Sequence, residues 1–178
     1  MKKSVYPLLA LVFLFILQWG CLVAQDQSEP GKRVNYSDPE TWVLGYFDLG
    51  FITTGIHSQW YISEHDSYSA DEEALSGLLA IPADDISITI VIGTWCPDSR
   101  RELPRFMKLM EFWDFPIERI TFIGVDSYKV APVGDYEELG IERVPTFIIY
   151  RNKVEAGRII EYPTASLERD MVNILSGI

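Results

Sequence analysis

The segment Ile86 to Ile92, which reads ISITIVI, constrains the fold more than any other part of the chain. Isoleucine fills every even position and Val91 adds an apolar side chain on the other face, which is typical of a buried central strand. The residues GTWCP end this strand, and an amphipathic helix follows with Leu103, Phe106 and Met110 on one side. A buried strand that leads directly into a helix predicts a layered α/β domain.

Further elements are predicted on both sides of this segment. We expect strands at residues 41–47, 120–125, 146–150 and 155–161, and helices at 53–65, 71–80, 135–139 and after a cap at Thr164. From residue 86 onward the order β-α-β-α-β-β-α implies parallel neighbours in its first part and an antiparallel edge at the late hairpin. Aromatic residues are expected to seal the leading segment over the sheet, with a substrate groove as the alternative: Trp42, Trp60, Tyr61 and Tyr68.

Residues 1–24 have the pattern of an export signal. Two lysines precede ten apolar residues at 8–17, a stretch too short for a membrane-spanning helix and right for a signal peptide. A cut after Ala24 would leave a soluble chain, whereas a cut before Cys21 would leave a lipidated cysteine and so a lipoprotein. Either outcome places the folded part in the periplasm or cell envelope, where thiols meet disulfides, and limits membrane contact to the signal or a lipid anchor.

Residues 25–40 are polar and form a predicted linker, so the predicted domain is 41–178, with an acidic extension at 41–85. The net charge of −11 argues against nucleic acid as a partner, because phosphate binding needs a basic face. His57 and His65 are predicted to lie on the surface. They lack a matching set of cysteines or carboxylates, so no metal site is expected. The sequence leaves the oligomeric state open.

Cys96 is placed where a helix begins directly after a buried strand. The unpaired N–H groups of a first helical turn carry partial positive charge and favour a thiolate. Pro97 suits the first helical position, where no backbone N–H is needed. Arg100 and Arg101 add positive charge nearby, and Ser99 lies within hydrogen-bonding reach of the sulfur. This setting favours a functional thiol over the alternative, a buried structural cysteine.

The stretch TWCPDSRRELP at 94–104 resembles the active-site turn of the thioredoxin superfamily, and VPT at 144–146 resembles that family's cis-proline turn. The similarity covers residues 86–178 closely and residues 41–85 only loosely. It implies a thioredoxin-like three-layer α/β/α fold with a mixed central sheet and an N-terminal extension. More narrowly, the cysteine turn and EYP at 161–163 resemble exported bacterial thioredoxin-like proteins with a single active-site cysteine.

The resemblance implies roles for individual residues. Cys96 corresponds to the nucleophile that forms a mixed disulfide, and Pro145 corresponds to the cis-proline beside it. Ser99 stands where the family has its second, resolving cysteine, and Ile90 stands where the family has a buried carboxylate. The residues that the resemblance implies for substrate binding are Trp95, Pro97, Val144 and Thr146.

Without a second cysteine, a mixed disulfide at Cys96 must be released by a small thiol, a partner thiol or the substrate's own second cysteine. The last route is disulfide isomerisation. The predicted function is therefore monothiol thiol–disulfide exchange, with a disulfide- or thiol-containing protein or a small thiol as partner and no cofactor. The alternative is a redox-silent module that holds an extended peptide at the proline turn. A peroxidase fits less well, because Ser99 cannot resolve a sulfenic acid.

Overall fold

The structure is a computed structural model that describes residues 34–178, which form one unit. The predicted signal peptide at 1–24, including the candidate lipidation site Cys21, lies outside the described residues, as does the linker up to residue 33. No helix within 34–178 has the length and apolar character needed to cross a membrane.

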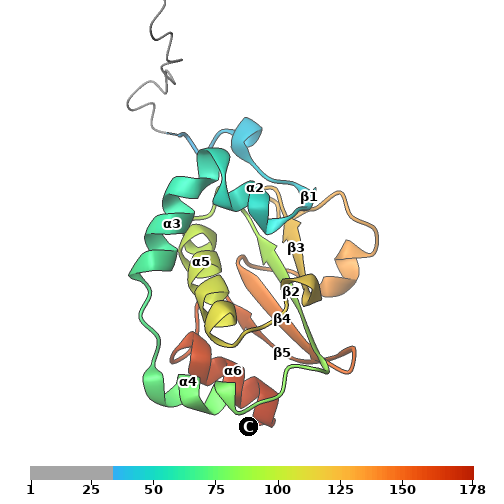
Figure 1. The fold of residues 1–178 in the computed structure, drawn as a ribbon. Coiled ribbons are helices and arrows are strands. Elements are labelled where there is room, and N and C mark those ends of the chain that lie inside the picture. Colours follow the sequence, from blue (N-terminus) through green and yellow to red (C-terminus); the bar gives the residue numbers. More distant parts are fainter. Residues whose placement is uncertain (1–33) are drawn as a thin grey trace, which may run out of the picture. The chain divides into compact units, whose positions relative to one another are not determined.

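A five-stranded mixed sheet forms the centre of the domain (Figure 1). Its strands are β1 (Gly45–Tyr46), β2 (Ile86–Ile92), β3 (Ile120–Gly124), β4 (Thr146–Arg151) and β5 (Val154–Ile160), in the spatial order β1-β3-β2-β4-β5. Strands β2 and β3 are parallel, and the other three pairings are antiparallel. β2 is the central strand, as its isoleucine pattern predicts.

Helices cover one face of the sheet. They are α2 (Leu49–Thr53), α3 (Ser58–Ser67), α4 (Glu72–Leu79), α5 (Pro97–Phe112) and α6 (Leu167–Ser176), with α3 beside α5 and α4 beside α6 (Figure 1). The even-numbered isoleucines of β2 face this layer and are at most 2% exposed. Phe106 of α5 stacks on Phe147 of β4, with ring centroids 4.3 Å apart, so α5 is anchored at the middle of the core.

The opposite face is covered by a single segment between β3 and β4. Its 3-10 helix η4 (Tyr136–Leu139) brings Tyr136 onto Val91 and Ile123, which form a second, smaller core cluster. Farther along the same strands, Thr121 is exposed, because this segment does not reach it. Helices, sheet and covering segment together make the three layers of the predicted α/β fold with a mixed central sheet.

The predicted strand at 41–47 is much shorter in the structure. Asp38 caps the 3-10 helix η1 (Pro39–Thr41), and only Gly45 and Tyr46 pair with β3. This pairing is antiparallel. The parallel neighbours that the element order predicts, at 86–92 and 120–125, are confirmed as β2 and β3. The backbone at Val43 approaches β3 closely at Gly124. Only glycine fits there, because a side chain at position 124 would collide with the Val43 carbonyl.

Two helix starts also differ from the prediction. The expected helix at 53–65 is interrupted near its start, because Thr54 is extended and Gly55 has a positive φ of 64°. Thr53 therefore ends α2, and the rest forms the 3-10 helix η2 (Gly55–His57) followed by α3. The last helix is capped by Ser166 instead of Thr164, and the Ser166 hydroxyl oxygen accepts a hydrogen bond from the Arg169 N–H at 3.2 Å. The predicted helix at 71–80 is confirmed as α4.

The prediction that both histidines lie on the surface is wrong for His57, which is 1% exposed. The ring of Tyr36 stacks on it, and the indole N–H of Trp60 donates to its Nδ1 at 3.4 Å. Burial and the neighbouring Arg100 lower the pKa of His57. Among residues 34–178 no group of three or more His, Cys, Asp or Glu side chains could hold a metal ion.

Candidate functional site

Cys96 lies between the end of β2 and the start of α5, as the sequence predicts. It is the N-cap residue of α5, with an extended backbone, and Pro97 fills the first helical position. Its carbonyl oxygen accepts the first helical hydrogen bond from the Arg100 N–H at 3.2 Å. The Cys96 residue is only 7% exposed, so a reactant must approach the sulfur through a narrow opening. Pro97 is exposed beside it.

The proline turn faces this thiol, although the two are 48 residues apart in the sequence. The Val144–Pro145 peptide bond is cis, and the Cys96 Sγ donates a hydrogen bond to the Val144 carbonyl oxygen at 3.3 Å. The Thr146 hydroxyl donates to the Arg143 carbonyl at 2.7 Å and closes the turn before β4 begins. The structure thus brings Cys96 together with the predicted residues of the proline turn.

Ser99 is fully buried one turn into α5. Its hydroxyl oxygen accepts a hydrogen bond from the Gly93 N–H at 3.2 Å. Ser99 therefore ties the first turn of the helix to the end of β2, a structural task that the sequence did not suggest. The sequence placed this hydroxyl within reach of the sulfur, and the structure directs its oxygen to the backbone.

Trp95 is folded back over the end of β2. A Cβ atom at Gly93 would lie 2.5 Å from the indole ring, so this approach requires glycine. The indole N–H donates to the Val125 carbonyl at 3.0 Å, and Trp42 packs against the ring with centroids 6.3 Å apart. Trp95 is therefore a fixed, half-buried wall beside Cys96.

The two arginines after Cys96 differ in their surroundings. Arg100 donates to the Thr94 carbonyl at 2.8 Å, and its guanidinium lies 4.6 Å from the ring centroid of Tyr36. Burial lowers the pKa of Arg100, while charge on Tyr36 and Cys96 opposes this shift. Arg101 instead pairs with Asp98 at 3.0 Å and with Glu102 at 2.6 Å. Of the two, Arg100 is therefore the positive charge that acts on Cys96.

Residues 34–43 form a strap that the sequence did not connect with the site. The buried Thr94 hydroxyl accepts a hydrogen bond from the Val43 N–H at 3.2 Å. Trp42 donates from its indole to the Tyr36 carbonyl at 2.9 Å, which places Tyr36 beside Arg100. Of the four aromatic residues predicted to seal the leading segment, Trp60, Tyr61 and Tyr68 pack on the main core, whereas Trp42 reaches the site.

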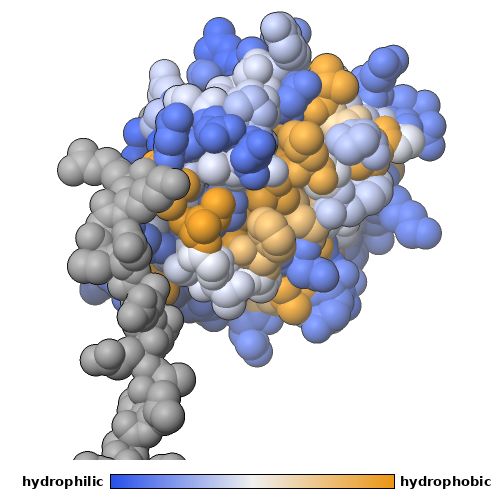
Figure 2. All heavy atoms as spheres, turned by 90° about the horizontal axis from the view of Figure 1, so that it is seen from above, coloured by the Kyte–Doolittle hydropathy of each residue, from blue (hydrophilic) through white to orange (hydrophobic). Residues whose placement is uncertain are grey.

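Two surfaces adjoin this site. A groove of about 760 Å³ lies beside Thr146, and it is lined by residues of the β4–β5 end that include Arg143, Glu161 and Tyr162. Arg143 and Glu161 form an ion pair of 2.8 Å there. Figure 2 looks onto the upper end of Figure 1, where hydrophobic side chains gather between polar ones. Exposed apolar residues of the elements at this end are Leu44, Phe51 and Ile56.

No protein-family model matches the chain, and no curated protein matches it. Similar solved structures include a protein of unknown function from Pseudomonas aeruginosa, with a TM-score of 0.53 and 16% identity over 74% of this chain and 90% of that one. They also include an HIV epitope scaffold, with a TM-score of 0.46 and 16% identity over 75% of this chain and 84% of the scaffold. The likeness to the Pseudomonas aeruginosa protein shows a shared fold.

Proposed function

We propose that this chain is an exported member of the thioredoxin superfamily that exchanges thiols with disulfides through Cys96 alone. One observation carries the proposal: the Cys96 thiol stands at the N-cap of α5 and lies 3.3 Å from the carbonyl of the cis Val144–Pro145 turn. The strand order β1-β3-β2-β4-β5 and the hairpin after the proline turn support it.

The electrostatics around the sulfur favour its reactive form. Cys96 stands at the N-cap of α5, and a helix of 16 residues has a positive N-terminal pole. Arg100 adds a full positive charge, whereas the negative charge of Asp98 is offset by its ion pair with Arg101. The nearest full charge to the sulfur that no ion pair offsets is therefore positive.

The exchange needs one cysteine and balances without a cofactor. The Cys96 thiolate attacks one sulfur of a substrate disulfide, so a bond forms between Cys96 and that sulfur while the second substrate sulfur leaves as a thiolate. Attack by a different thiol of the same substrate then releases Cys96 and leaves a rearranged disulfide. This isomerisation consumes no oxidant or reductant. Alternatively, a small or partner thiol attacks the Cys96 sulfur of the mixed disulfide and releases the substrate as a dithiol, and a second such thiol then frees Cys96 as the two external thiols become a disulfide.

The substrate that fits this arrangement is an extended, disulfide-bearing segment of another protein. The groove beside Thr146 adjoins the proline turn, and the apolar residues at the upper end of the domain offer contact to such a segment. Trp95 and Pro97 border the sulfur from the other side.

A second candidate function is capture of an extended peptide without redox chemistry. The low exposure of Cys96 and its hydrogen bond to the Val144 carbonyl favour this alternative, because both protect a thiol from reaction. In this case the groove beside Thr146 would bind the partner, and replacing Cys96 by serine would leave binding intact.

Adduct formation with glutathione disulfide separates the two functions. In a Cys21→Ser background Cys96 is the sole cysteine, so intact mass should show one glutathione adduct that is absent from the Cys96→Ser variant. Adding Ser99→Cys supplies a resolving thiol, and the adduct should then give way to an internal disulfide. Failure of Cys96 to form any adduct in the folded protein would contradict the exchange function and favour the binding module.

A further inference from the structure

The strap at residues 34–43 is attached to the domain by few contacts. Within it only Val43 is buried, and the other residues are exposed or half-buried. The Tyr36 hydroxyl donates to the Ile56 carbonyl at 2.8 Å, and the Tyr36 ring stacks on His57 with centroids 5.8 Å apart. A segment with so little buried surface opens at a lower free-energy cost than the core. The closed strap therefore depends strongly on what lies beneath Tyr36.

The group beneath Tyr36 is the buried imidazole of His57. Its Nδ1 accepts a hydrogen bond from the Trp60 indole N–H at 3.4 Å, so this nitrogen carries no proton in the closed structure. A proton on Nδ1 would place two N–H donors against each other and break this bond. The packing of the strap on His57 thus selects the neutral ring.

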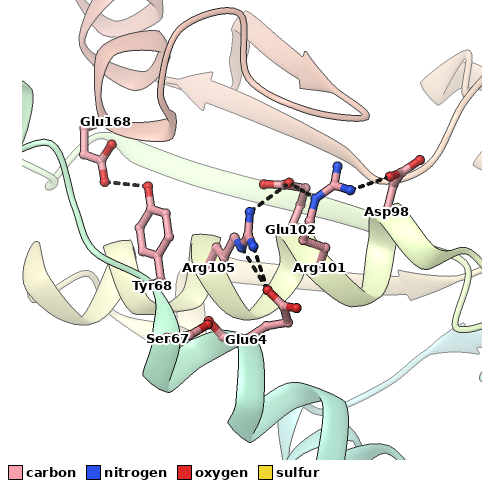
Figure 3. A network of polar contacts seen from close by, with 8 residues as sticks. All are labelled: Glu64, Ser67, Tyr68, Asp98, Arg101, Glu102, Arg105 and Glu168. Atoms are coloured by element: carbon pink, nitrogen blue, oxygen red, sulfur yellow. Dashed lines mark hydrogen bonds and ion pairs between the residues drawn. The ribbon is translucent and has the colours of Figure 1, made fainter.

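A positive charge without an ion pair lies on the same tyrosine. The Arg100 guanidinium is 4.6 Å from the centroid of the Tyr36 ring and donates to a backbone carbonyl, with no ion pair to a carboxylate of residues 34–178. Figure 3 shows that the next two arginines of α5, Arg101 and Arg105, are instead paired with carboxylates. A proton on His57 would therefore meet a positive charge that no carboxylate offsets.

The side chains around His57 come from four elements. The strap contributes Tyr36, α2 contributes Phe51, α3 contributes Trp60 and α5 contributes Arg100. Phe51 and Trp60 do not titrate, and burial raises the pKa of Tyr36, which stays neutral in acid. Arg100 is thus the one charged member of this set. Burial and Arg100 lower the pKa of His57, and a backbone hydrogen bond with Thr41 opposes them only in part.

The direction of the pH dependence follows from this arrangement. When the strap opens, His57 meets water and its pKa returns towards the ordinary value of about 6.5. The open form then binds a proton more tightly than the closed form. The closed strap consequently keeps its full stability above about pH 6.5 and loses stability as the pH falls below it.

We propose that proton uptake by His57 opens the strap at residues 34–43 as a unit. Opening removes Tyr36 from Arg100 and Trp42 from Trp95, which both lie beside Cys96. The switch makes this flank of the cysteine turn accessible in acid and covers it at neutral pH. Strap opening itself needs no thiol chemistry, and only its consequence for Cys96 rests on the proposed function.

Hydrogen exchange of the full chain at pH 7.5 and pH 5.5 tests the switch. The readout is the protection factor of the Val43 amide, which donates to the Thr94 hydroxyl and so reports detachment of the strap. One proton taken up near pH 6.5 should lower this protection about three- to tenfold between the two pH values. The amide of Met171, in the core helix α6, should keep its protection. No fall at Val43, or an equal fall at Met171, would overturn the proposal.

Two histidine variants assign the response. His57→Gln should abolish the difference between the two pH values at Val43. His65→Gln is the matched control and should retain it, because His65 lies at the far end of α3, bonded to Glu111 at 2.8 Å. A fall that persists in His57→Gln would contradict the proposal.

Arg100→Gln decides the matter if His57→Gln does not fold. It removes the charge that opposes the proton, so the fall at Val43 should become smaller, and an unchanged fall would contradict the switch. These readouts lie on the strap, so a Cys96 that fails to react with disulfides would leave them unaffected. The switch and the proposed function can therefore fail separately.

Discussion

The cysteine turn lies at the start of α5, and the Glu168 pocket, which Tyr68 also lines, lies between the middle of α5 and the start of α6. The two regions hold their polar groups by different means. At the helix start, Cys96 is held by backbone groups and packed rings, with Arg100 as the nearby full charge. In the middle of the helix, Glu102 and Glu64 are held by ion pairs with Arg101 and Arg105, and Glu168 is held by a hydrogen bond from Tyr68. A helix terminus supplies partial charge by itself, whereas a mid-helix site must bring its counter-charges from other elements.

The largest expected loss of stability comes from breaking the contact between α5 and β4, because both regions include residues of α5. Phe106 is fully buried against Phe147, so Phe106→Ala should lower the free energy of unfolding by about 3–5 kcal/mol. Urea unfolding followed by circular dichroism measures this loss. Phe112→Ala on the same helix is the control, because Phe112 is 41% exposed and should cost about 1 kcal/mol or less. Equal losses would show that Phe106 does not anchor α5.

Removing a tyrosine hydroxyl beside Glu168 should lower the free energy of unfolding more than removing one from the surface. Tyr68→Phe removes the hydrogen bond to buried Glu168, so we expect a loss of about 1–3 kcal/mol in the free energy of unfolding at pH 7. The same change at Tyr128, which is 84% exposed, should have almost no effect. A Tyr68→Phe variant that is as stable as the wild type would contradict a stabilising role for this hydrogen bond.

The attachment of the strap at residues 34–43 should depend on the hydroxyl of Thr94, next to the cysteine turn. Thr94→Val keeps the side-chain shape but removes the acceptor of the Val43 N–H, which should cost roughly 1 kcal/mol. Hydrogen exchange should show a faster Val43 amide in this variant, while the amides of α6 keep their rates. Thr121→Val is the control, since Thr121 is exposed on β3. Unchanged exchange at Val43 would rule out Thr94 as the anchor of the strap.

The smallest expected effect is on the rate of Cys96 attack, and it distinguishes the role of Arg100 from that of Arg101. Arg100→Gln should slow attack of Cys96 on a small disulfide roughly two- to fivefold, the range of a partly exposed charge interaction. Arg101→Gln should change this rate less, because Arg101 already pairs with Asp98 and Glu102. Stopped-flow absorbance with an aromatic disulfide gives both rates, and a larger effect at Arg101 would reverse the assignment.

The two sites also differ in what the sequence can reveal. The cysteine turn is contiguous, and a buried strand that ends at Cys96 predicts both the helix start and the place of the thiol. The antiparallel pairing of β1 could not be predicted, because it depends on the close approach of Val43 to Gly124 across the fold.

The Glu168 pocket has no comparable signal in the sequence. Tyr68 and Glu168 are 100 residues apart, and although Tyr68 is expected to pack over the sheet, nothing in the segment around Glu168 marks this carboxylate as buried. Burial of His57 was missed for a similar reason, because Tyr36 and Trp60 cover it only after the strap and α3 come together. Residue type alone does not reveal which polar side chains the tertiary fold will bury.

The central claim is that Cys96 is an activated nucleophile. Its most direct test is the rate at which Cys96 attacks a small aromatic disulfide at pH 7, measured in the Cys21→Ser background for the folded chain and for the same chain unfolded in urea. We predict a faster reaction in the folded chain, because the positive pole of α5 and the Arg100 guanidinium lie beside the sulfur only in the folded state. A folded chain that reacts only after unfolding would show that Cys96 is a structural cysteine.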